Sequence, residues 1–213
     1  MSLVLTDLTV LLHGRPLFAP LTLTIAAGEV ATVMAPSGAG KSTLLDAIGG
    51  HLAPGLVARG GIALNGRDLT RLPAEKRRIG LMFQDAVLFP HLSVGDNLAF
   101  GLTATLKGRV ARAEAVRAAL AQAGLAGFEA RDPATLSGGQ RARAALMRTL
   151  LAEPEALLLD EPFGKLDTEL RTEIRAFTLS HIRARAIPAL LVTHDPEDAR
   201  AAAGPILSLK AST

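Results

Sequence analysis

Nine consecutive residues in the first quarter of the chain have the types and spacing of a phosphate-binding loop. Glycines at Gly38 and Gly40 allow backbone N–H groups at a helix N-terminus to approach phosphate oxygens closely. In such a loop the ammonium of Lys41 is expected on the β- and γ-phosphates, and the hydroxyl of Ser42 on Mg²⁺. The first position is not the usual glycine. The loop (P-loop) reads Ala35, Pro36, Ser37, Gly38, Ala39, Gly40, Lys41, Ser42, Thr43.

A second glycine-rich motif lies about a hundred residues downstream. It reads Ser137-Gly138-Gly139-Gln140, follows Leu136 and precedes a stretch rich in Ala, Leu and Arg at helical spacing. One chain needs two anion-binding motifs if the first holds a nucleotide and the second closes over the nucleotide held by another copy. The two motifs together therefore predict an ATPase that works as a dimer.

Two further polar groups follow apolar runs that are typical of buried strands. Asp160 and Glu161 end the run Ala156–Leu159, which suits a carboxylate in a Mg²⁺ shell and one that orients or deprotonates the attacking water. Acidic pairs also end strands as plain loop residues, so this assignment depends on the P-loop. His194 follows Leu190–Thr193 at a strand end, where ligand groups gather in open α/β sheets. It equally fits a capping or core histidine.

The elements around these motifs predict the fold class. Thr22–Ile25 alternates polar and apolar residues, Val30–Met34 is a buried strand that leads into the P-loop, and Leu44, Leu45 and Ile48 have helical spacing after it. Strands and helices alternate again after residue 150, which predicts a mainly parallel α/β core. We expect one domain over 1–213, with a catalytic core from 1–84 and 151–213 and a helical subdomain at about 85–150.

Composition limits the classes of function. The 213 residues carry a formal charge of +3 from 23 basic and 20 acidic side chains, which is too small and dispersed for a nucleic-acid surface. The densest basic cluster, Glu75–Arg78, is interpreted as a solvated helix face. No run approaches the ~18 apolar residues of a membrane span, and no secretory signal is expected. The absence of cysteine excludes a thiolate metal site.

Taken in order, the motifs resemble the nucleotide-binding subunit of ATP-binding cassette (ABC) transporters over essentially the whole chain. The resemblance makes Gln84 a contact of Mg²⁺ and water, places Ser137, Gly139 and Gln140 on the γ-phosphate of a partner, and lets Asp167 bridge the two sites. It implies a P-loop NTPase core, an N-terminal antiparallel β subdomain and a helical signature subdomain. The matching positions are 35–42, Gln84, Leu136–Gln140, Asp160–Glu161, Leu166–Asp167 and His194.

The same resemblance implies cofactors, partners and a location. It implies ATP and Mg²⁺, a second copy in a head-to-tail ATP-sandwich dimer, membrane-spanning permease subunits and, indirectly, a solute-binding protein, at the cytoplasmic face of the cell membrane. Phe89–Val94 with Asn97 and Leu98 is similar to the importer branch, where this segment helps form the groove that receives a coupling helix of the permease. The alternative is that the segment is ordinary core of the helical subdomain. The segment Asp132–Arg143 is also similar to the small ATPase of Ynj-type importers.

Two segments depart from the family pattern. Family members usually stack adenine on an aromatic side chain near the start of the fold, whereas this chain has no Tyr or Trp and reads Leu11–Gly14 there, with His13 as the candidate. Phe163–Leu166 has Lys165 where a small residue is common.

Two alternative functions remain open, that of a soluble nucleotide-binding regulatory or adaptor protein and that of the ATPase of an ABC exporter. A cassette ATPase of translation or DNA repair is disfavoured.

Overall fold

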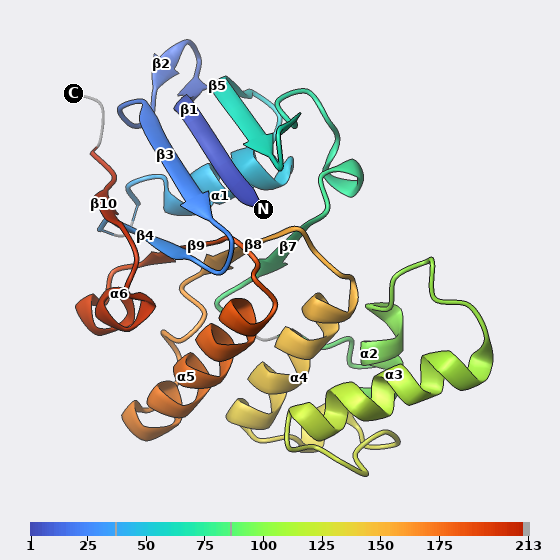
Figure 1. Ribbon diagram of the computed structural model, residues 1–213. Helices are drawn as coiled ribbons and strands as arrows, with labels where there is room; N and C mark the ends of the chain where they lie inside the picture. Colours follow the sequence, from blue (N-terminus) through green and yellow to red (C-terminus); the bar gives the residue numbers. More distant parts are fainter. Residues whose placement is uncertain (37, 86, 211–213) are drawn as a thin grey trace. The chain divides into compact units, whose positions relative to one another are not determined.

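The computed structural model describes residues 1–36, 38–85 and 87–210, and two compact units can be distinguished within them (Figure 1). The first contains residues 1–81, 155–161 and 179–213, and the second contains residues 82–154 and 162–178. The division into a catalytic core and a helical subdomain, with the bounds given above, stays a prediction.

Two sheets form the frame of the first unit. In the antiparallel sheet β1 pairs with β2, β3 and β5, and β5 pairs with β6; the parallel sheet has the order β10-β4-β9-β8-β7. The strands are β1 (Ser2–Leu12), β2 (Arg15–Pro16), β3 (Leu21–Ala26), β4 (Val30–Met34), β5 (Leu56–Leu64), β6 (Arg67–Asp68), β7 (Ile79–Met82), β8 (Ala156–Asp160), β9 (Ala189–Thr193) and β10 (Ile206–Ser208).

The burial of these strands follows their sequence patterns. In β3 every second side chain is buried, namely Leu21, Leu23 and Ile25, as expected for a strand with one face on the core. By contrast β8 and β9 are almost continuously buried, as expected for parallel strands covered on both faces. The predicted α/β class, with a parallel sheet and an N-terminal antiparallel sheet, is confirmed.

Helix α1 (Lys41–Gly49) connects the two sheets through one hydrophobic core. Leu44, Leu45 and Ile48 are each at most 1% exposed and share this core with side chains from β1, β5, β4 and β9. Helix α6 (Pro196–Ala202) packs against β4 and β9. Because α1 packs against strands of both sheets, the direction in which its N-terminus points is fixed.

Arg77 corrects the interpretation of the basic cluster as a solvated face. Its side chain follows the short 3₁₀ helix η1 (Ala74–Lys76) and is only 5% exposed. The guanidinium donates hydrogen bonds to the carbonyl oxygens of Ala47 and Ile48, at 2.8 and 2.7 Å, and to that of Leu72. The carbonyl oxygens of Ala47 and Ile48 belong to the last turn of α1, where a cation is favourable. Burial lowers the pKa of Arg77.

The second unit is built mainly from helices. In α3 (Arg109–Gln122) the side chains of Val116 and Leu120 are buried, and Ala123, the residue that follows the helix, is 1% exposed. None of the helices in the described residues is long and apolar enough to cross a membrane. The elements are α2 (Val94–Phe100), α3 (Arg109–Gln122), the 3₁₀ helix η2 (Pro133–Thr135), α4 (Gly138–Leu151) and α5 (Thr168–Ala184), of which residues 168–178 belong to this unit.

Candidate nucleotide-binding site

The P-loop connects β4 to the N-terminus of α1, in the order that an anion site requires. Gly38 and Gly40 have positive φ angles of 82° and 88°, and Gly40 is the N-cap of the helix. The first backbone N–H groups of a helix have no partner within it, and the first turn of α1 carries no acidic side chain. This end of α1 is therefore suited to phosphate oxygens. Ser37 lies outside the described residues.

Ala35 replaces the first glycine of the motif without backbone strain. It does not have the left-handed φ that would favour glycine, and its methyl group is buried in the core of the first unit. At the other end of the loop, a Cβ at Gly40 would come within 3.1 Å of the Phe18 ring, which is fully buried. The ring of Phe18 packs close to Gly40 and supports the P-loop, a role that was not predicted from the sequence.

Lys41 forms an ion pair with Glu161, and this contact is the centre of the site. The two side chains are 7% and 15% exposed, and Lys41 also donates to the carbonyl oxygen of Ala35 at 3.0 Å. Nδ1 of His194 lies 3.0 Å from the other carboxylate oxygen of Glu161. The structure thus brings together the expected phosphate ligand, the expected general base and the histidine, from three different segments of the first unit.

The backbone at Glu161 explains how its carboxylate reaches both neighbours. Its φ is 44°, a left-handed value that is uncommon for a residue with a side chain, and its N–H donates to the Val192 carbonyl oxygen at 2.9 Å. Strain of this kind is concentrated at functional sites. Burial by itself would raise the pKa of Glu161, but the hydrogen bonds and charges of Lys41 and His194 lower it overall. The carboxylate is therefore ionised at neutral pH.

His194 is held at the junction between β9 and α6. The next residue, Asp195, caps α6 by accepting the N–H of Glu197 at 2.7 Å, and its own N–H donates to the Thr193 hydroxyl. The imidazole is 57% exposed, which excludes the alternative of a core histidine. The cap of α6 is Asp195, so the capping alternative for His194 is also excluded.

Asp160 and Ser42 offer the oxygen donors that a nucleotide-bound Mg²⁺ uses. Asp160 is the last residue of β8 and is partly exposed, and Ser42 is exposed in the first turn of α1. Mg²⁺ is typically bound by one or two carboxylates together with substrate phosphates, rather than by an all-protein cage. The described residues contain no group of three or more His, Asp or Glu side chains that could hold a metal ion.

The signature motif lies in the second unit and begins α4. The Ser137 hydroxyl accepts the N–H of Gln140, and the Gln140 side chain accepts the N–H of Ser137, which completes a capping box. A Cβ at Gly139 would clash with the side chain of Leu170. Gly139 therefore has a packing reason as well as the expected phosphate role.

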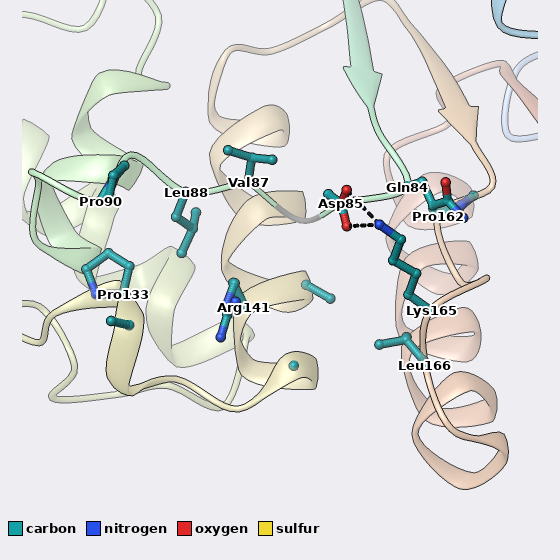
Figure 2. A pocket seen from close by; sticks show the side chains of 13 residues that line it. Gln84, Asp85, Val87, Leu88, Pro90, Pro133, Arg141, Pro162, Lys165 and Leu166 are labelled. Atoms are coloured by element: carbon teal, nitrogen blue, oxygen red, sulfur yellow. Dashed lines mark hydrogen bonds and ion pairs between the residues drawn. The ribbon is translucent and has the colours of Figure 1, made fainter.

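Asp167 and Gln84 lie in the second unit as well. The Asp167 carboxylate accepts the N–H of Leu170 at 3.1 Å in the first turn of α5, so it caps that helix. Gln84 is exposed at the edge of a groove of about 520 Å³, shown in Figure 2. The groove is lined by Gln84, Asp85, Val87, Leu88, Pro90, Pro133, Ala134, Gly138, Arg141, Ala142, Pro162, Lys165 and Leu166.

The segment after Gln84 is shaped by Asn97, which is fully buried. Its amide donates to the carbonyl oxygens of Phe89, Leu92 and Ser93 and accepts the N–H of Phe89 at 2.7 Å. The Phe89 ring packs edge-on against Phe100, with ring centroids 4.9 Å apart. Val87 and Leu88 line the groove, so they are better probes of it than Phe89.

The expected base-binding segment forms the turn between β1 and β2. His13 has a φ of 50° and is exposed, and Leu12 beside it is 39% exposed. No aromatic side chain other than His13 stands in this turn, whose sequence is Leu12–Arg15. The adenine role of His13 stays a prediction.

The sequence matches the family described as ABC transporter over residues 18–164. The chain belongs to this family. It is 53% identical over 175 residues to the ABC transporter ATP-binding protein YnjD of Escherichia coli K12, covering 82% of this chain and 80% of that protein. It is 42% identical over 197 residues to the thiamine import ATP-binding protein ThiQ of Shigella flexneri, covering 92% of this chain and 83% of that one.

Among solved structures, the fold is similar to that of cbiO1 from Clostridium perfringens, part of the ABC transporter complex cbiONQ. The TM-score is 0.85 at 27% identity, and the match covers 98% of this chain and 84% of the other. The chain is therefore an ATP-binding subunit of the ABC importer type and an ABC transport ATPase, and the predicted family is confirmed.

Proposed function

We propose that this ABC ATPase powers solute import by closing on ATP as a head-to-tail dimer with a second copy. The observation that supports this most directly is the cluster of Lys41, Glu161 and His194 at the carboxyl ends of β8 and β9 and the start of α1, in which the Lys41–Glu161 pair is largely buried and His194 is exposed. Ligand groups of open α/β sheets gather at this edge. We assign to these three residues the roles of a phosphate ligand, a base and a second water contact, all supplied by one chain.

The roles within the first unit follow from their chemistry. Lys41 moves from Glu161 to the β- and γ-phosphates when ATP binds, and the α1 N-terminus receives the remaining phosphate oxygens. Glu161 then orients and deprotonates the attacking water, with His194 as its hydrogen-bond partner. Ser42 and Asp160 would hold Mg²⁺, which supplies charge neutralisation at the phosphates. The expected Mg²⁺ contact of Gln84, a residue of the second unit, stays a prediction.

The roles within the second unit concern the partner copy. Ser137, Gly139 and Gln140 at the N-terminus of α4 would face the γ-phosphate held by the other chain, and Asp167 would bridge the two sites. The exposed positions of Ser137 and Asp167 are compatible with this role, since each side chain caps the start of a helix and is still open to solvent. Binding free energy of ATP would thus become closure of the dimer.

The groove of Figure 2 is our candidate for the permease contact. Its walls combine apolar side chains such as Val87, which is 57% exposed, with a few charged ones. Exposed apolar surface of this kind marks a contact site. A permease helix seated there would hold the subunit at the cytoplasmic face of the membrane, and a solute-binding protein would act through the permease.

A mixing experiment tests the composite site. Lys41→Ala removes the phosphate ligand, and Gly138→Asp places a carboxylate at the N-terminus of α4. At Gly138 a new Cβ meets Leu166 at 3.9 Å and Leu170 at 4.0 Å, which is ordinary contact, so this lesion is cleaner than one at Gly139. Each variant alone should fail to hydrolyse ATP and should fail to form a dimer when ATP is added.

In a heterodimer of the two variants, one composite site carries both lesions and the other carries neither. The mixture should therefore recover ATP-dependent association, measured by light scattering, and some ATP hydrolysis. An inactive mixture of two folded variants would refute the head-to-tail arrangement. Activity of Gly138→Asp alone would show that the signature motif does not act on a partner.

A further inference from the structure

An ion pair links two segments of the second unit that are 80 residues apart in the sequence. Nζ of Lys165 lies 2.6 and 2.8 Å from the two carboxylate oxygens of Asp85. Figure 2 shows the pair at one end of the groove, beside Gln84 and Pro162. The proposed catalytic steps use neither charge, and Lys165 stands where related chains commonly have a small residue.

Both segments are anchored close to the ion pair. The N–H of Leu166 donates to the carbonyl oxygen of Phe163 at 3.2 Å, and the Phe163 side chain is fully buried, so Lys165 sits in a fixed turn. The Asp85 carbonyl oxygen accepts the N–H of Val87 at 2.8 Å. Because hydrogen bonds and the buried Phe163 side chain hold these turns in place, a shift of one segment is transmitted through the ion pair to the other.

The pair is too exposed to serve the stability of the fold. The side chains of Lys165 and Asp85 are 55% and 61% exposed, and exposed ion pairs contribute little to the free energy of unfolding. A weak contact can still set the relative position of two segments, because small differences in free energy shift a conformational equilibrium. Asp85 directly follows Gln84, and Lys165 stands two residues before Asp167.

We propose that Lys165 is a positioning residue, whose ion pair with Asp85 holds the segment carrying Asp167 in a fixed relation to the segment carrying Gln84. A contact made at the groove is thereby transmitted to the surface that meets the second copy. The inference rests on the proposed function, because it gives Asp167 its place at the dimer surface. Loss of the pair weakens ATP-driven dimerisation and leaves the stability of the chain unchanged.

The test uses Glu161→Gln as the parent, since slow hydrolysis allows the ATP-bound dimer to be measured. Four variants are added to it: Lys165→Ala, Asp85→Asn, Lys165→Arg, and the charge reversal Asp85→Lys with Lys165→Asp. Sedimentation equilibrium with ATP gives the dimer dissociation constant, and thermal unfolding gives the melting temperature. The matched control is Glu173→Gln, which removes another exposed ion pair of the same unit, with Arg143.

We expect Lys165→Ala and Asp85→Asn each to raise the dissociation constant about two- to five-fold, the range open to an exposed ion pair. Lys165→Arg, the charge reversal and Glu173→Gln should keep the parent value, and all melting temperatures should agree. If the parent itself does not dimerise with ATP, the proposed function fails and this inference with it. If the parent dimerises but the single variants match it, or charge reversal does not restore the dimer, the inference alone is overturned.

Discussion

We expect Lys41 to leave Glu161 for the phosphates of ATP, so the structure predicts a competition between the carboxylate and the nucleotide for this ammonium. Replacing Glu161 by Gln should raise the affinity for a non-hydrolysable ATP analogue while it slows ATP hydrolysis. The reason is that the free chain no longer loses a charge-assisted contact when Lys41 turns to the nucleotide. Hydrolysis should fall by roughly 10²–10⁴-fold, the usual contribution of a positioned general base.

The magnitude of the affinity change follows from the burial of the pair. With side chains only 7% and 15% exposed, the contact is shielded from water, and hydrogen bonds to charged groups contribute about 1.5–3 kcal/mol. A glutamine oxygen still accepts a hydrogen bond from Lys41, worth about 1 kcal/mol. The difference is about 0.5–2 kcal/mol, which corresponds to roughly two- to thirty-fold in the dissociation constant.

Isothermal titration calorimetry of the purified chain measures this change, with two control variants. Glu161→Asp keeps the charge but shortens the side chain, so it separates loss of the contact from loss of repulsion between the carboxylate and the phosphates. Glu155→Gln removes another carboxylate of the first unit, paired with Arg78 at 3.1 Å, and should leave the affinity unchanged. An affinity of Glu161→Gln equal to or weaker than that of the natural chain would refute the competition.

Four further expectations use the same geometry. Lys41→Ala should abolish nucleotide binding in the same calorimetric assay, and retained binding would contradict its place on the phosphates. Val87→Glu should reduce co-purification with membrane subunits while the chain stays folded, whereas Phe89→Glu should lower the melting temperature, because its ring packs against Phe100; an unaffected Val87→Glu complex would argue against the groove. GTP should compete with ATP better than in relatives with an aromatic base platform, since nucleobase stacking is worth ~1–3 kcal/mol; an ATP preference that survives His13→Ala would show that another group reads the base. Burial raises the pKa of Glu161, but Lys41 and His194 lower it overall. The difference in unfolding free energy between the natural chain and Glu161→Gln should therefore be present above the ordinary pKa of 4.5 and disappear as the pH falls through the lowered pKa. Denaturant titrations at several pH values measure this difference, and a difference that persists in stronger acid would contradict the pairing.

The sequence determined those parts of the protein that depend on local pattern. The buried strand before Gly38, the helix from Lys41 and the capping pair Ser137 with Gln140 are all set by neighbours within a few residues. The order of the motifs along the chain then indicated the family. Periodicity and turn chemistry act over short distances, so they can be recognised without a structure.

Contacts between distant segments were decided by the tertiary structure alone. Arg77 was expected in solvent, yet it is buried against the last turn of α1, 29 residues away, because the carbonyl oxygens of Ala47 and Ile48 there, together with that of Leu72, accept hydrogen bonds from its guanidinium. The pairs of Lys41 with Glu161 and of Lys165 with Asp85 join residues 120 and 80 positions apart. Such pairs depend on which strands become neighbours in the sheet and which turns meet, and no local pattern records that. The hydrogen bond from Glu161 to the carbonyl oxygen of Val192 is likewise decided by the tertiary structure, because only the folded sheet places that oxygen within reach.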